Sequence, residues 1–213
     1  MSAYPEFDES MHLNPLGAPT LWLQTKYPVV AASRLRLRPF TLFDITRLVS
    51  VVCAQRIAEI SLAVPQLFHA RQARQWIDTH PTQWRKRCAV HWAVCGLDSD
   101  RLSGYVGLHD IQLQRGQAEL SFWIAERIAR KDLAIEAAQA ALAFAFTSLQ
   151  LDTVGALQLS GNALTARILR RLGMKLEHAA AQTVSRRVRD EAVFIWSVSR
   201  SAWMIALQDG AAH

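Results

Sequence analysis

The stretch Ala118–Ala141, AELSFWIAERIARKDLAIEAAQAA, contains an abrupt change of hydrophobic period. Its first part alternates as a strand does, with one set of residues on each face: Ala118, Leu120, Phe122 and Ile124 on one, and Glu119, Ser121 and Trp123 on the other. From Leu133 the apolar residues recur at helical spacing, which predicts a helix that runs to about Leu149. A helix start presents free backbone N–H groups and a positive dipole end, so the charged turn Glu126–Asp132 before it suits a phosphate. The turn adds positive charge through Arg127, Arg130 and Lys131.

This stretch resembles the acyl-CoA-binding core of the GNAT N-acetyltransferases, especially the branch that acetylates protein N-termini, ribosomal proteins among them. In that family an aromatic-aromatic-aliphatic strand end leads into a Gln/Arg-x-x-Gly-x-Gly/Ala turn around the pyrophosphate of acetyl-CoA, and a Thr-Glu-Ala helix start follows. Phe122-Trp123-Ile124 matches the strand end, Arg127 the first turn position, and Ala134–Ala137 the helix start. The two glycines do not match, because Arg130 and Asp132 stand in their places.

Three further segments resemble the same branch. The run SRLRLRP (33–39) followed by Asp44 resembles its opening strand and helix start. Asn162 and Thr165 match an Asn-x-x-Ser segment, in which the Asn contacts the pantetheine arm and the Ser lies near the CoA sulfur. The ending Arg200–Trp203 is also similar. The resemblance implies an α+β GNAT acyl-CoA N-acyltransferase fold, with a mixed, mostly antiparallel central sheet flanked by helices. It places an N-terminal extension at 1–32, the acetyltransferase domain at 33–203 and a short, frayed tail at 204–213.

Local patterns give further expectations for the chain. In the opening strand Leu35 and Leu37 are expected to face inward and Arg34, Arg36 and Arg38 outward. Thr41 or Asp44 would cap a helix through about Glu59, and a second helix, Ala70–Ile77, is expected to stop before Pro81. The extension shows no sustained period, and Trp22 and Tyr27 are expected to pin it to the domain.

Composition limits the class of protein. The chain has 213 residues, of which 51% are hydrophobic, which excludes a disordered chain and favours one domain. Its net charge of +6 favours anionic partners. Three cysteines without a CxxC pair, and no basic-then-apolar start, indicate a cytoplasmic protein with reduced thiols. No zinc-like spacing and no bilayer-length apolar stretch is present, so neither a metal nor a membrane is expected.

By resemblance, the reaction is direct transfer of an acetyl group from acetyl-CoA to a primary amine. The backbone at Trp123, Ile124 and Ala125 would hold pantetheine and polarise the thioester carbonyl, while Leu133 and Asn162 would also contact the cofactor. Glu119 lies where this branch often carries its general base, although a solvated outer residue is an equal alternative. His109 is a weaker candidate, and Thr165 would either protonate the departing thiolate or bond locally at its helix start.

The altered turn leaves three outcomes open. Glycines let backbone N–H groups approach a phosphate, whereas Arg130 brings a large side chain and Asp132 a carboxylate that repels pyrophosphate by about 1 to 4 kcal/mol. Asp132 is also a good helix cap, and would then occupy the N–H groups that the phosphate would use. In the first, CoA binds normally with help from Arg130 and Lys131. In the second, it binds weakly or in a shifted pose. In the third, the fold has lost catalysis and serves as a binding or regulatory module.

The expected partners are acetyl-CoA and an amine acceptor, either a protein N-terminal α-amine or a small-molecule amine. Two basic groups could instead meet the 3′-phosphate of CoA, an acidic acceptor or nucleic acid: Arg167, Arg170, Arg171 and Lys175, and Arg186, Arg187 and Arg189. We interpret them as solvated surface, because no interleaved aromatic residues support nucleic-acid binding. A homodimer is left open.

Overall fold

A computed structural model describes residues 26–54, 69–125, 131–180 and 192–210. The strands are β1 (Val30–Ala31), β2 (Leu35–Arg38), β3 (Val90–Gly96), β4 (Leu102–Gln112), β5 (Gln117–Ile124), β6 (Thr153–Leu159), β7 (Lys175–Ala180) and β8 (Val193–Ser199). The helices are α1 (Ile45–Ala54), α3 (Ala70–Arg85), α4 (Lys131–Ala143), α5 (Ala163–Arg171) and α6 (Arg200–Gly210). Short turns of other helix types are η2 (Leu42–Asp44), η3 (Leu113–Arg115) and η5 (Phe144–Ser148).

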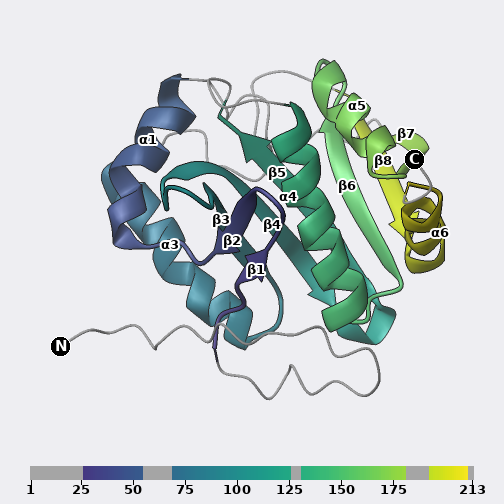
Figure 1. Ribbon diagram of the computed structural model, residues 1–213, viewed down its shortest axis with the longest axis horizontal. Helices are drawn as coiled ribbons and strands as arrows, with labels where there is room; N and C mark the ends of the chain where they lie inside the picture. Colours follow the sequence, from purple (N-terminus) through teal and green to yellow (C-terminus); the bar gives the residue numbers. More distant parts are fainter. Residues whose placement is uncertain (1–25, 55–68, 126–130, 181–191, 211–213) are drawn as a thin grey trace.

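The eight strands form one mixed sheet in the order β1-β2-β3-β4-β5-β6-β8-β7. Every neighbouring pair is antiparallel except β5 and β6, which are parallel and joined through α4. Figure 1 shows α4 crossing the front of the sheet, α1 and α3 at its left, and α5 and α6 at its right beside β7 and β8. The expected α+β architecture is confirmed.

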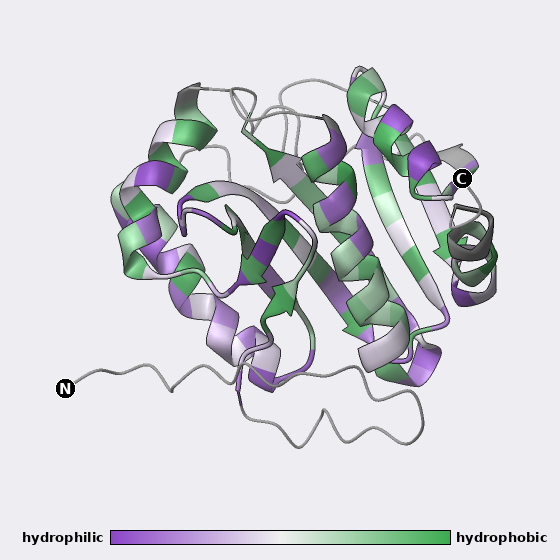
Figure 2. Ribbon diagram, in the orientation of Figure 1, coloured by the Kyte–Doolittle hydropathy of each residue, from purple (hydrophilic) through white to green (hydrophobic). Residues whose placement is uncertain are grey.

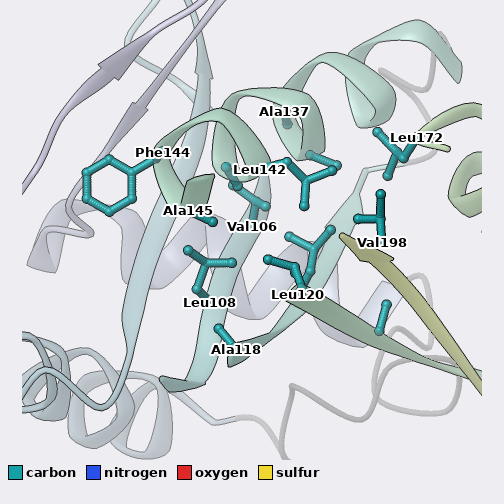
Figure 3. Packing of buried hydrophobic residues seen from close by; sticks show 14 of the residues in the cluster. Val106, Leu108, Ala118, Leu120, Ala137, Leu142, Phe144, Ala145, Leu172 and Val198 are labelled. Carbon is teal, nitrogen blue, oxygen red and sulfur yellow. The ribbon is translucent and has the colours of Figure 1, made fainter. Parts of the chain in front are cut away.

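One face of the sheet packs against α4. Figure 3 shows Val106 and Leu108 of β4 and Leu120 of β5 beneath Ala137 and Leu142 of α4. The small alanines of α4 let the helix lie close to the strands, and the helix continues into a π-helical turn in which Leu149 N–H donates to Phe144 O. The helix predicted from Leu133 to about Leu149 is therefore confirmed. We call this the first core.

The opposite face packs against α1 and α3. The second core contains residues from both helices, from β3, β4 and β5, and from the segments next to them: Phe40, Leu48, Val51, Val52, Ala73, Ile77, Ala93, Cys95, Leu102, Tyr105, Trp123 and Ala125. Because both faces are covered, the alternation that we predicted along β5 separates two cores rather than core from solvent.

The predicted stop of the second helix before Pro81 was wrong. α3 continues through Pro81 to Arg85. Four of its residues at helical spacing are buried, Ala73, Ile77, His80 and Trp84. Packing of this face offsets the hydrogen bond that proline cannot donate. Figure 2 shows the corresponding mixture of hydrophobic and hydrophilic residues along this helix.

Arg38 was also predicted wrongly, since it is buried rather than facing outward. It is 5% exposed, and its guanidinium donates to both carboxylate oxygens of Asp44, at 2.8 and 2.9 Å. It also reaches Asp100 Oδ1 at 2.9 Å. Asp44 in turn accepts from Thr41 N–H at 2.8 Å, so the helix start predicted at Thr41 or Asp44 is confirmed, while the predicted end near Glu59 lies outside the described residues. Leu35 and Leu37 are buried as expected.

Both ends of the described chain are held to the domain, the first as we expected and the second more firmly than we expected. Tyr27 pins the N-terminal segment, because its hydroxyl donates to His91 O at 2.8 Å and accepts from His91 N at 2.7 Å; Trp22 lies outside the described residues. At the other end α6 extends to Gly210, where we expected a frayed tail. Arg200 anchors α6 by donating to Leu151 O at 2.8 Å. The domain boundaries themselves remain a prediction.

Candidate active site

The pairing between β5 and β6 stops half-way along β5. The parallel register joins Gln117–Leu120 to Thr153–Ala156. Beyond it, β5 stays paired with β4 up to Ile124, and β6 stays paired with β8 up to Leu159. The two strands therefore diverge, and among the described residues the 121–124 segment has no strand partner on its β6 side. An extended ligand could pair with this free edge.

Hydrogen bonding to β4 decides which backbone groups face the gap. The Ala125 N–H donates to the Ser103 carbonyl at 2.9 Å. Because ladder bonds alternate along an antiparallel pair, the Trp123 N–H also faces β4, and the Ile124 N–H points toward the gap. We expected backbone donors at Trp123, Ile124 and Ala125, but only the Ile124 N–H points into the gap between β5 and β6.

The side chains at the strand end divide between the two cores. Trp123 is 5% exposed and stacks on Tyr105 with ring centroids 6.2 Å apart, whereas Ile124 packs against the first core. The Trp123 indole nitrogen is buried and has no hydrogen-bond partner among the described residues. Gly104 allows β4 to approach here, since a Cβ at this position would lie 2.5 Å from the Trp123 carbonyl oxygen.

The predicted phosphate turn is described only at its end. Arg127 and Arg130 lie outside the described residues, and Lys131 is the first residue of α4. Asp132 is exposed and lies inside the first helical turn, not at the preceding cap position that we considered for it. A carboxylate there stabilises the helix dipole and also competes with a bound anion. Leu133 is half-buried against the first core.

Asn162 caps α5 at the same edge of the sheet. Its Oδ1 accepts from Thr165 N–H at 3.0 Å, and its carbonyl accepts from Gln158 Nε2 at 3.0 Å. Gln158 is held by the indole of Trp196, which donates to Gln158 Oε1 at 2.8 Å. α5 ends at Arg171, and Gly173 follows at φ 77°, the left-handed conformation that glycine adopts after a helix. Figure 1 shows that α4 and α5 both begin at the upper edge of the sheet, where β5 and β6 diverge.

A polar cluster lies on the second-core face of β4 and β5. The Nε2 atom of His109 is 2.7 Å from Tyr105 Oη and 2.5 Å from Ser121 Oγ. Tyr105 Oη is also 3.1 Å from Nδ1 of His91, and His91 Nε2 is 2.8 Å from Gln83 Oε1. Gly107 makes room for the Tyr105 hydroxyl, which would collide with a Cβ at this position.

Glu119 lies directly opposite His109 in the β4–β5 pairing. Its side chain is half-buried on the same face as Ser121 and Trp123. Burial, and secondarily the negative charge of Asp110, raise the pKa of Glu119 above its ordinary value. Burial lowers the pKa of His109 to about 4, so this imidazole is neutral at pH 7.

The structure therefore brings together two of the predicted catalytic candidates, Glu119 and His109, and adds residues that we did not predict. Tyr105, Ser121, His91 and Gln83 come from β4, β5, β3 and α3. The alternation along β4 could have placed Tyr105 and His109 on one face. Nothing local in the sequence indicates that His91 and Gln83 pack against them.

The sequence and the fold were both compared with those of known proteins. The model of the acetyltransferase (GNAT) domain family matches residues 34–175. The chain belongs to the GNAT acetyltransferases. The predicted family, fold and class of enzyme, an N-acetyltransferase, are therefore confirmed.

Two relatives come from Bacillus subtilis. The chain is 22% identical to the uncharacterized N-acetyltransferase YoaA over 156 residues, which cover 73% of this chain and 88% of YoaA. It is 28% identical to the putative ribosomal N-acetyltransferase YdaF over 144 residues, which cover 63% and 79% respectively. Among solved structures, the ribosomal L7/L12 alpha-N-protein acetyltransferase RimL in complex with coenzyme A superposes with a TM-score of 0.74. That match has 15% identity and covers 82% of this chain and 99% of RimL.

None of the helices in the described part of the chain combines the length and the apolar composition of a membrane span. Among the same residues, His, Cys, Asp and Glu side chains form no group of three or more that could hold a metal ion.

Proposed function

We propose that this GNAT protein transfers the acetyl group of acetyl-CoA directly to the α-amine of a protein N-terminus. The observation that carries the proposal is the divergence of β5 from β6, which leaves Ile124 N–H directed into the gap. In this proposal the pantetheine arm pairs with the free edge of β5, and Ile124 N–H donates to the thioester oxygen as negative charge develops there.

The acceptor amine attacks the carbonyl carbon, a C–N bond forms, and the C–S bond to CoA breaks without an acyl-enzyme. We assign the proton acceptor for the attacking amine to Glu119. Its half-buried carboxylate lies on the face lined by α1 and α3, and its raised pKa strengthens it as a base.

The remaining cofactor contacts are assigned by their places in the fold. The starts of α4 and α5 flank the gap, so Lys131 and Leu133 on one side and Asn162 and Thr165 on the other would line the cofactor. Arg127 and Arg130 complete the proposed phosphate site from the turn before α4.

The acceptor is supported by the names of the relatives. YdaF and RimL are described as acting on ribosomal proteins, and RimL on an α-amine. A small-molecule amine is the alternative acceptor.

We further propose a cytoplasmic location, which three free cysteines support, and leave a homodimer open. The basic face of α5 is partly structural, because the Arg170 guanidinium lies 5.4 Å above the Trp196 ring.

A second candidate function is a binding module with weakened CoA affinity, favoured by Asp132. Its exposed carboxylate lies in the first turn of α4, where the family's turn supplies N–H groups to pyrophosphate. The two candidates differ in whether acetyl-CoA and an amine are converted to CoA and an acetylated amine.

The test is acetylation of a panel of N-terminal peptides and small amines, followed by mass spectrometry. Transfer to peptide α-amines at rates above those for small amines is expected. Ile124→Pro removes the proposed donor without breaking a bond to β4, and should lower kcat by about 100-fold, as loss of one oxyanion donor does. Ile124→Val is the matched control and should stay near the parent rate. No transfer to any amine would overturn the proposal.

A further inference from the structure

The hydrogen-bond chain from Gln83 to Ser121 fixes the tautomer of each ring. The amide oxygen of Gln83 can only accept, so His91 carries its proton on Nε2 and presents a lone pair at Nδ1. Tyr105 therefore donates its hydroxyl proton to His91 Nδ1, and its oxygen accepts from His109 Nε2. His109 is thus protonated on Nε2, and its Nδ1 is a lone pair that takes part in no hydrogen bond among the described residues.

Ser121 ends this series of hydrogen bonds, at the point where β5 leaves β6. It is the first residue of β5 beyond the pairing with β6, and its Oγ is 2.5 Å from His109 Nε2. Its side chain points to the same face as Glu119 and Trp123. The hydroxyl thus lies on the unpaired part of β5, three residues before Ile124, and in contact with an imidazole N–H.

We propose that His109 and Ser121 carry a proton from the acceptor side of the site to the thiolate of the departing CoA. Glu119 accepts the proton of the attacking amine and passes it to His109 Nδ1. Nε2 gives its own proton to Ser121 Oγ, and the Ser121 hydroxyl proton goes to the CoA sulfur. The C–N bond forms as the C–S bond breaks. Ser121 ends as a hydroxyl and His109 as the Nδ1–H tautomer, which exchange with water returns to Nε2–H. The proposal rests on the proposed function.

The groups around His109 favour transfer of a proton through the imidazole over an imidazole that stays protonated. Its ring faces His91 from β3, Tyr105 from its own strand and Glu119 and Ser121 from β5. From α3, His80 stacks on His91 with ring centroids 4.2 Å apart. Burial holds the pKa of His109 at about 4 and that of His80 at about 3, so neither ring accumulates charge near neutral pH.

The first experiment measures acetyl transfer by Ser121→Ala, His109→Gln and the double variant. With acetyl-CoA, each single change should lower kcat by about 100-fold, the usual size of a general acid–base contribution, and the double variant should lose no more. With an S-acetyl thiophenol donor, whose thiolate needs no proton, Ser121→Ala should react like the parent. Ser148→Ala, at the end of η5, is the matched control.

The second experiment needs no activity. Nitrogen-15 NMR of the full chain should show His109 protonated on Nε2. Gln83→Leu should abolish that preference, and Gln83→Glu, which keeps an accepting oxygen, should retain it. An Nδ1–H tautomer in the parent, or an unchanged kcat for Ser121→Ala in a parent that transfers acetyl groups, would overturn the inference. A parent that transfers nothing while showing the Nε2–H tautomer would overturn the proposed function instead.

Discussion

Glu119 is the single residue on which the proposed proton removal depends. Replacing it with Gln keeps the size of the side chain but removes the base, so kcat should fall by about 100-fold at neutral pH. The loss should shrink at alkaline pH, where the acceptor amine is already deprotonated. The pH–rate profile measures this, with exposed Glu177→Gln as the control. A parallel profile for parent and Glu119→Gln would remove Glu119 from the mechanism.

At the residue scale, the sequence predicts side-chain direction better than side-chain partners. The two faces of β5 followed from a period of two, and Glu119 was placed correctly on the face opposite Leu120. The same rule predicted wrongly that Arg38 faces solvent. Alternation cannot reveal that Asp100, 62 residues later in the sequence, places its Oδ1 2.9 Å from Arg38 Nε. For the same reason Ser121 was assigned to a face but not to a contact with His109.

At the scale of elements, β2 is tied to η2 by one buried ion pair. Arg38 and Asp44 each have about 6% of the side chain exposed. Arg38→Met would leave the Asp44 carboxylate buried without its cation, so the free energy of unfolding should fall by about 3–5 kcal/mol. Arg36→Met removes a 43% exposed side chain that also binds Asp100, and should cost about 0–1 kcal/mol. Urea unfolding of both variants checks the difference, and equal losses would contradict the assignment.

Element boundaries were predictable where turn chemistry decides them. The helix end at Gly173 and the strand end before Pro39 follow from glycine and proline geometry. The passage of α3 through Pro81 and the helical form of α6 depend on packing against distant residues, such as burial of Trp84 and Trp203 in the first core. The predicted phosphate turn was the segment where the sequence departs from its family, and most of it lies outside the described residues.

At the scale of the whole molecule, buried imidazoles make stability depend on pH. Burial lowers the pKa of His80 from 6.5 to about 3, and both its ring nitrogens lack hydrogen-bond partners among the described residues. Because the pKa of His80 is lower in the folded protein than in the unfolded chain, the unfolded chain binds more protons as the pH falls. Stability is therefore full above pH 6.5 and falls as pH drops toward 3, by at most about 1.4 kcal/mol per unit for one group.

His80→Phe tests this dependence, because a ring of similar shape can occupy the same place between Phe40 and Trp76. The variant should match or exceed the parent in melting temperature at pH 5, and its stability should decline less between pH 7 and pH 5. Exposed His69→Asn is the control. An unchanged pH dependence in His80→Phe would show that this ring is not the group responsible.

Every proposed step of the reaction requires acetyl-CoA to bind at the diverging strands, beside an altered phosphate turn. Isothermal titration of acetyl-CoA into the parent protein, alongside Asp132→Gly and the control Asp98→Gly, measures this directly. We predict saturable micromolar binding with one site per chain, strengthened in Asp132→Gly because a carboxylate is removed from the start of α4, and unchanged in Asp98→Gly. No binding by the parent, with binding gained in Asp132→Gly, would mean that Asp132 closes the site and would favour the binding-module function. No binding by either protein would contradict the account.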